Sequence, residues 1–178
     1  MTDDEYDDLF RSTYPRLVAM GLAMSTSRHV SQELAQETML RAHHHRDELD
    51  AYDSPIAWCR RVMGNLLIDH HRSRSSEAAA IERLGHRESS HDDRTPDPAT
   101  VAASIRWADL TRSLSPQQRL AATLYYAEDH SVADVAEIMD IATGTVKSAL
   151  SKARANLRRR LGGSDEFFPD ERDTEARS

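Results

Sequence analysis

Apolar residues recur along most of this chain at the spacing of an α-helix, and that periodicity restricts the fold more than any other feature. One predicted helix begins at Ser54-Pro55, and its buried stripe would consist of Cys59, Val62, Met63, Leu66 and Leu67. Neither 5–74 nor 102–161 contains a convincing run in which apolar and polar residues alternate, as they do in a half-buried strand. The sequence therefore predicts an all-α protein.

Length and composition limit the size of any core. The chain has 178 residues, of which 39% are hydrophobic and 30% charged, and this suits one domain or two small ones. Neither a membrane-spanning apolar run nor a signal-peptide pattern is present, so a cytoplasmic protein is expected. The single cysteine, Cys59, excludes an internal disulfide and a zinc site built on paired cysteines. Its place on the apolar stripe favours packing over redox sensing.

Two polar segments divide the chain. Residues 75–101 are rich in Ser, Asp, Arg and Pro, and they contain too few apolar side chains to offset the entropy cost of ordering. Residues 163–178 form a second acidic segment, which is predicted to be a disordered tail. We therefore expect two small helical domains, a first block at 1–74 and a second block at 102–162, joined by a flexible acidic linker.

Charge is distributed unevenly along the chain, whose formal net charge is −7. Residues 105–162 hold 9 basic and 6 acidic residues, a net charge of +3, whereas 76–104 and 163–178 are net acidic. A basic module between two acidic segments suggests a nucleic-acid partner for that module. Phe167 and Phe168 lie in the acidic tail, where they could dock on a partner or fold back on the basic module as an inhibitor.

The second block contains clear helix starts. Ser115, followed by Pro116 and Gln118, is typical of a capping box and predicts a helix that runs to about Glu128. Ser131 with Asp134 predicts a second capped helix over 132–139. A third helix follows a short turn, with Thr143 as its expected N-cap. A short helix, a tight turn and a longer basic helix are typical of a helix-turn-helix.

That third helix, "TGTVKSALSKARANLRRRL", has two distinct faces. Its apolar stripe consists of Val146, Ala149, Leu150, Ala153 and Leu157. Its opposite side is small, polar and cationic, with Ser148, Ser151, Lys152, Ala155 and Arg159, and with Lys147 and Arg158 beside them. Such a face suits contact with phosphates and base edges. A merely solvated helix face is the alternative. Core helices can also follow one another in a helix-turn-helix pattern, so it is that pattern together with the cationic face that favours DNA binding.

A polar line also runs along the predicted helix of the first block. It consists of Arg61, Asn65, Asp69 and Arg72, at steps of four, four and three residues. Asp69 and Arg72 could simply form a surface ion pair, which contributes less than about 1 kcal/mol. The alternative is that the exposed Asn65, which lies between arginines, recognises bases, because its amide both donates and accepts hydrogen bonds. The residues alone favour the ion pair.

Three stretches together resemble a known family. "SQELAQETMLRA", "SPIAWCRRVMGNLLIDHHRSR" and "LSPQQRLAATLYYAEDHSVADVAEIMDIATGTVKSALSKARANL" occur in this order, with a polar linker before the third. The chain resembles the extracytoplasmic-function (ECF, group IV) sigma factors of bacterial RNA polymerase over about 150 residues. The resemblance implies sigma region 2 in the first block and region 4 in the second. It also implies a subunit that binds core polymerase and directs promoter-specific initiation by recognising the −35 element and melting the −10 element.

Transferred by position, the resemblance implies three sets of site residues. The −35 element would be contacted by Lys147, Ser148, Ser151 and Lys152, with Arg158 and Arg159 on phosphates. The −10 element would be contacted by Arg61, Asn65, Asp69 and Arg72. For these residues the resemblance outweighs the interpretation of Asp69 and Arg72 as a simple surface ion pair. The β′ clamp helices of the polymerase would contact Glu33, Gln36, Glu37 and His43.

Four residues depart from the family's pattern. Glu33 stands where the family usually has aspartate, and His43 stands where it has an aromatic residue, often Trp. Ala149 stands where many members have arginine, and Tyr125 where some have a DNA-contacting arginine. The resemblance therefore implies −35 binding without naming the sequence that is bound.

The resemblance also implies partners and excludes others. The partners are core RNA polymerase, through its β′ clamp helices and β flap, promoter DNA and a cognate anti-sigma factor; no cofactor, no catalytic activity and no direct membrane insertion are expected. Metal binding by His43-His44-His45 or His70-His71 is not expected, because adjacent helical side chains point about 100° apart. A stand-alone helix-turn-helix regulator remains the alternative function, and it would bind a specific DNA duplex tightly without polymerase.

Overall fold

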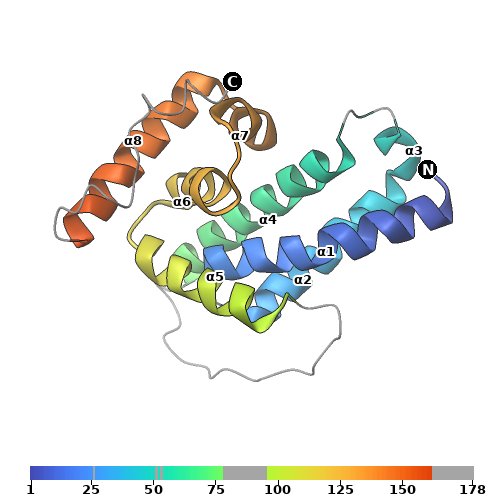
Figure 1. Ribbon diagram of the computed structural model, residues 1–178, viewed down its shortest axis with the longest axis horizontal. Helices are drawn as coiled ribbons and strands as arrows, with labels where there is room; N and C mark the ends of the chain where they lie inside the picture. Colours follow the sequence, from blue (N-terminus) through green and yellow to red (C-terminus); the bar gives the residue numbers. More distant parts are fainter. Residues whose placement is uncertain (26, 51, 53, 78–95, 162–178) are drawn as a thin grey trace.

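The computed structural model describes residues 1–161 except 26, 51, 53 and 78–95. All regular elements in this part of the chain are helical, which confirms the all-α prediction (Figure 1). The N-terminal helices are α1 (Asp3–Ser25), α2 (Arg28–His44), α3 (Arg46–Leu49) and α4 (Pro55–Glu77). The C-terminal helices are α5 (Pro98–Thr111), α6 (Pro116–Ala122), its π-helical continuation η1 (Thr123–Ala127), α7 (Val132–Met139) and α8 (Thr143–Arg160).

The N-terminal helices pack around the stripe predicted for α4. Cys59, Met63 and Leu67 are fully buried, and the Ser54 hydroxyl accepts a hydrogen bond from the Ala57 N–H at the start of the helix. Burial raises the pKa of the Cys59 thiol to about 12, so this cysteine is protonated and unreactive near neutral pH. The expectation that Cys59 is a packing residue agrees with this environment.

The helix starts of the second block are largely as predicted. The capping boxes of Ser115 with Gln118 and of Ser131 with Asp134 are both formed. The hydrogen bond from Ser131 is the main cause that lowers the pKa of the Asp134 carboxyl, in keeping with its charged role in the cap. The helix that begins at Pro116 reaches Ala127 as predicted, although its last turn is π-helical, with the Glu128 N–H bonded to the Thr123 carbonyl at 3.1 Å.

The predicted N-cap of the basic helix is wrong by one residue. Ala142, rather than Thr143, is the N-cap, with φ −64° and ψ 144°, and Thr143 is already helical. The Ala142 carbonyl accepts hydrogen bonds from the N–H groups of Thr145 and Val146. The preceding turn explains the shift, because Asp140 adopts a left-handed conformation (φ 54°) that closes α7 and starts the new helix early.

The two groups of helices pack against each other, which the sequence analysis did not anticipate. In Figure 1, α6 and α7 lie between α4 and α8, and α5 lies along α1. One apolar cluster joins Met63 and Leu67 of α4 to Leu120, Leu124 and Ile138 of the C-terminal helices. We call this contact surface between α1–α4 and α5–α8 the N–C interface.

Parts of the expected linker are helical at both ends, since α4 extends to Glu77 and α5 begins at Pro98, capped by Asp97. Residues 78–95 and the acidic tail, including Phe167 and Phe168, lie outside the described residues. None of the described helices is long and apolar enough to span a membrane. Within the same residues, no three His, Cys, Asp or Glu side chains converge on a point where a metal ion could sit.

The crossing of α1 and α2 depends on Gly21. A Cβ at this position would lie 2.7 Å from Ser31 Cβ and 2.9 Å from Ser31 Cα, so the two backbones would have to separate. We predict that Gly21→Ala lowers the free energy of unfolding by about 1–3 kcal/mol, because overpacking outweighs the gain in helix propensity. Chemical denaturation followed by circular dichroism measures the change.

Gly144→Ala is the matched control, since a Cβ there would meet nothing within 4 Å. Its stability should be unchanged or raised by up to about 1 kcal/mol. A Gly21→Ala chain as stable as the Gly144→Ala chain would contradict the close crossing of α1 and α2.

Candidate nucleic-acid interface

The rotation of α8 about its axis is set by its apolar stripe. Val146, Leu150, Ala153 and Leu157 are buried against the other C-terminal helices. Lys147, Ser148, Ser151 and Lys152 are consequently exposed on the opposite side, together with Arg159. The faces predicted from the helical spacing are therefore the faces of the folded helix, and we call the exposed side the α8 face.

The cations of α8 have different environments. Lys147 and Lys152 are the two lysines of the whole sequence, and both lie on the α8 face. Arg160 instead donates hydrogen bonds to the carbonyls of Asp109 and Leu110 near the end of α5, at 3.1 and 3.0 Å. Arg154 is only 7% exposed, and Arg158 is half-buried. The outward positive charge of α8 therefore comes mainly from Lys147, Lys152 and Arg159.

Arg154 was not recognised in the sequence as a buried residue. The signal was present, because position 154 follows Leu150 by four residues and precedes Leu157 by three, which places it on the apolar side. A long arginine stem can line a core edge while its guanidinium reaches a polar group.

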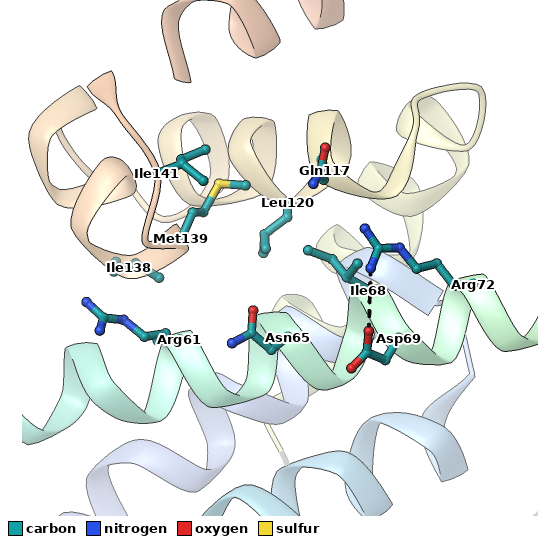
Figure 2. Close-up of a pocket in the computed structure, with 10 residues that line it drawn as sticks. All are labelled: Arg61, Asn65, Ile68, Asp69, Arg72, Gln117, Leu120, Ile138, Met139 and Ile141. Atoms are coloured by element: carbon teal, nitrogen blue, oxygen red, sulfur yellow. Dashed lines mark ion pairs between the residues drawn. The ribbon is translucent and has the colours of Figure 1, made fainter. Parts of the chain in front are cut away.

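The polar line of α4 is formed as the spacing predicted. Figure 2 shows Arg61, Asn65, Asp69 and Arg72 along the helix. Asp69 Oδ1 and Arg72 Nη1 are 3.8 Å apart, and both side chains are well exposed, so this ion pair contributes little to stability. Arg61 differs from the others, because its Nη2 donates a 2.7 Å hydrogen bond to the Glu137 carbonyl of α7.

A pocket of about 280 Å³ lies in front of this line. One wall is the α4 line with Ile68, and the other is made by the C-terminal helices: Gln117, Leu120, Ile138, Met139 and Ile141. In Figure 2, Leu120, Ile138 and Met139 lie across from the polar side chains. The polar line of α4 therefore faces a mostly apolar wall in this conformation.

The predicted clamp-binding residues lie on α2. Glu33, Gln36 and Glu37 line an open groove of about 750 Å³ with side chains of both α1 and α2. His43 lies outside this groove, and its ring packs edge-on against Tyr6, with 4.9 Å between the ring centroids. Glu37 Oε1 is paired with Arg41 Nε at 2.8 Å. The structure thus brings three of the four residues together and places the fourth beside them.

The groove also contains apolar residues that sequence analysis missed: Tyr6, Phe10, Leu34, Met39 and Leu40. Leu40 is 52% exposed, the largest exposure of a big apolar side chain in the described residues. Tyr6 donates a 2.8 Å hydrogen bond to the Met39 carbonyl, and burial is the main cause that raises its pKa. The helical spacing of Leu40 from Gln36 was a signal that could have placed it on the same face.

Comparisons with known proteins bear on both groups of helices. The family model "Sigma-70 region 2" matches residues 9–77, and "Sigma-70, region 4" matches residues 105–157. The chain is 30% identical over 159 residues to the ECF RNA polymerase sigma factor SigM of Mycobacterium tuberculosis, covering 88% of this chain and 77% of that protein. It is 29% identical over 161 residues to the RNA polymerase sigma-E factor of Streptomyces coelicolor, covering 90% and 88%.

A solved structure has the same fold. It is the sigma factor RpoE of Bartonella quintana in complex with the anti-sigma factor NepR, with a TM-score of 0.66 at 24% identity, covering 89% of this chain and 97% of that one. The region 2 match falls on the N-terminal helices and the region 4 match on the C-terminal helices. The two relatives are matched over most of their own length. The chain belongs to the ECF sigma factors of RNA polymerase.

Proposed function

We propose that this sigma factor binds core RNA polymerase and directs initiation at specific promoters, with α8 on the −35 element and α4 on the −10 element. The observation that carries the proposal is the α8 face, where an exposed polar and cationic surface is held outward by a buried apolar stripe. No catalytic group of this chain is needed for such a role. Action on promoters implies a cytoplasmic location.

The chemistry of the α8 face suits a major groove. Residues in the N-terminal half of a recognition helix meet base edges, and Lys147, Ser148 and Ser151 occupy that half of α8, with Lys152 directly after it. Lysine donates to guanine acceptors, and serine can serve either kind of base. Arg159 and the half-buried Arg158 lie near the C-terminal end, where we assign them to phosphates.

The α4 line suits unpaired bases. Opening a duplex costs a few kcal/mol per base step, and hydrogen bonds, stacking and phosphate contacts must offset that cost. The Asn65 amide can donate and accept, the Asp69 carboxylate can accept from an exocyclic amine, and Arg61 and Arg72 can meet phosphates or stack on bases. This set provides recognition and opening without nucleotide hydrolysis.

The α1–α2 groove is the proposed contact with the β′ clamp helices. Glu33, Gln36 and Glu37 provide its polar edge, and the exposed Leu40 provides apolar surface that a partner helix could bury. We assign His43 to the end of this contact and the C-terminal helices to the β flap. A cognate anti-sigma factor is also proposed, because the solved relative was found in complex with one.

The role of the two lysines is open to a direct test. We predict that Lys147→Ala with Lys152→Ala weakens holoenzyme binding to duplexes with a −35 element by about 1–3 kcal/mol per lysine. Each lysine that neutralises a phosphate also adds about −0.9 to the slope of log K against log salt, so that slope should become shallower. Run-off transcription from a genomic promoter library with purified core polymerase would identify the promoters, and filter binding over a salt series would give both quantities.

Arg106→Ala is the matched control, because Arg106 is an exposed cation of the C-terminal helices outside the α8 face. It should leave promoter affinity and salt slope close to those of the wild type. Equal losses in both variants would refute a specific role for the α8 face. Tight, specific duplex binding by the free wild-type chain would instead support a stand-alone regulator.

The α4 line predicts a complementary defect. Asn65→Ala should reduce transcription from intact duplex promoters by about 5- to 150-fold, because a bidentate contact between an amide and a base is worth about 1–3 kcal/mol. Holoenzyme binding to a duplex that carries only the −35 element should not change. The lysine variant should lose binding to that −35 duplex, so each variant serves as a control for the other. An Asn65→Ala chain that loses −35 binding, or that transcribes normally, would contradict the assignment.

A further inference from the structure

The chain uses the two kinds of side-chain cation very unequally. Of its 23 lysine and arginine residues, Lys147 and Lys152 are the lysines, and all the others are arginines. A guanidinium stays protonated in proteins, whereas an ammonium can lose a proton and become an amine nucleophile. Side-chain chemistry that needs a lysine amine is therefore limited to two positions of the sequence, and both lie on the α8 face.

Several arginines hold helices together, and the two lysines do not. Arg60 Nε of α4 lies 2.8 Å from Glu128 Oε2, just after η1, with both side chains mostly buried. Arg119 of α6 donates from Nη1 to the Met24 carbonyl at 2.7 Å, and Arg160 donates to two carbonyls near the end of α5. Among the described residues, neither lysine ammonium forms a hydrogen bond or an ion pair. A chemical change at either Nζ therefore breaks no contact on which the fold depends.

The geometry of the α8 face leaves both lysine amines open to a small reagent. Lys147 and Lys152 are exposed, and their positions lie about 7.5 Å apart along the helix axis and about 140° apart around it. The exposed side chains between them on this face are small, namely Ser148, Ser151 and Ala155. The two lysines thus stand at the two edges of the α8 face.

The charge around these amines favours an anionic reagent. The sequence of α8 contains no acidic residue, and Arg158 and Arg159 add positive charge near its C-terminal end. A surface of one sign of charge raises the local concentration of small ions of the opposite sign. An acyl phosphate is such an ion, because a negatively charged phosphate group is joined directly to its activated acyl group. The α8 face therefore combines two amine nucleophiles with a field that attracts this class of acyl donor.

We propose that Lys147 and Lys152 are acylation sites, each of which takes an acyl group directly from an acyl phosphate. The neutral amine attacks the carbonyl carbon of the donor, a C–N bond forms, and the C–O bond to the phosphate group breaks. Inorganic phosphate leaves with the electron pair of that bond, and the proton of the amine passes to the phosphate or to water. The product is an amide, which carries no positive charge.

Acylation then switches off the DNA contact of α8, and this part of the proposal rests on the proposed function. Each acyl group removes one of the charges assigned to the −35 element and adds apolar bulk at the edge of the face that meets bases. The loss should resemble that of Lys147→Ala with Lys152→Ala, about 5- to 150-fold in binding for each lysine. An arginine cannot be switched in this way, so the two lysines have a property that the other cations lack.

The first measurement is the rate at which acetyl phosphate acetylates the full chain, followed by peptide mapping with mass spectrometry. Lys147→Arg with Lys152→Arg, the arginine pair, keeps both charges and removes both amines. Adding Arg106→Lys to the arginine pair gives a matched control, with one exposed amine on α5, outside the α8 face and three residues before Asp109. We expect both lysines of the wild type to be acetylated at least about threefold faster than the amine of this control, and the difference should shrink as salt is added.

The second measurement is binding of holoenzyme to a duplex that carries the −35 element, with the chain treated or untreated before it is mixed with core polymerase. Acetylation should weaken binding by the wild type and make its salt dependence shallower, while circular dichroism stays unchanged. The arginine pair and the Arg106→Lys control should each keep the affinity that they had before treatment. A saturating amount of the same duplex should also slow acetylation of both lysines in the wild-type holoenzyme, because bound DNA covers them.

The opposite results refute separate parts of the proposal. Equal rates in the wild type and in the Arg106→Lys control, or no acetylation of Lys147 and Lys152, would refute the acylation sites. Acetylated lysines with unchanged −35 binding would refute the switch and, with it, the role assigned to α8. Failure of the untreated chain to initiate with core polymerase would refute the proposed function, while the acetylation rates would still decide whether the two lysines are acylation sites.

Discussion

Helix α4 is buried on two sides, and most of the molecule is arranged around that fact. Cys59, Met63 and Leu67 face the core of the N-terminal helices, and Gly64 receives Leu120 of α6 on a neighbouring side. A helix has a limited circumference, so only a narrow strip remains for polar residues. That strip is the line from Arg61 to Arg72, and the same packing that defines it also brings α7 to its edge.

Helix α8 is buried on one side only, and its opposite side is exposed to solvent. Its stripe from Val146 to Leu157 packs on α6 and α7, whose own starts are fixed by the capping boxes of Ser115 and Ser131. The left-handed Asp140 sets the angle at which α8 leaves α7. Local backbone chemistry thus determines which cations face outward, and Arg160 is drawn instead to the carbonyls of α5.

The sequence was informative where one residue's role depends on its near neighbours. Periodicity placed the stripes of α4 and α8, and the Ser-x-x-Gln and Ser-x-x-Asp patterns placed two helix starts, because both signals lie within a few residues. The N-cap of α8 was missed because a left-handed turn, rather than a hydroxyl, decides where that helix begins. The N–C interface was missed for another reason. Arg60 with Glu128, and Gly64 with Leu120, are single pairs separated by more than fifty positions, and they leave no repeating pattern.

The N–C interface combines polar contacts with an apolar cluster that continues from α4 into the C-terminal helices. A partly buried arginine–carboxylate pair adds little net stability, because water solvates both partners when they separate. Hydrogen bonds from Arg61 and Arg119 to backbone carbonyls can be exchanged in the same way. Separation would expose apolar surface at the contacts of Leu120, Leu124 and Ile138 with α4, and the Leu120 contact rests on Gly64. Arg61 belongs both to this interface and to the line that we assign to the −10 element.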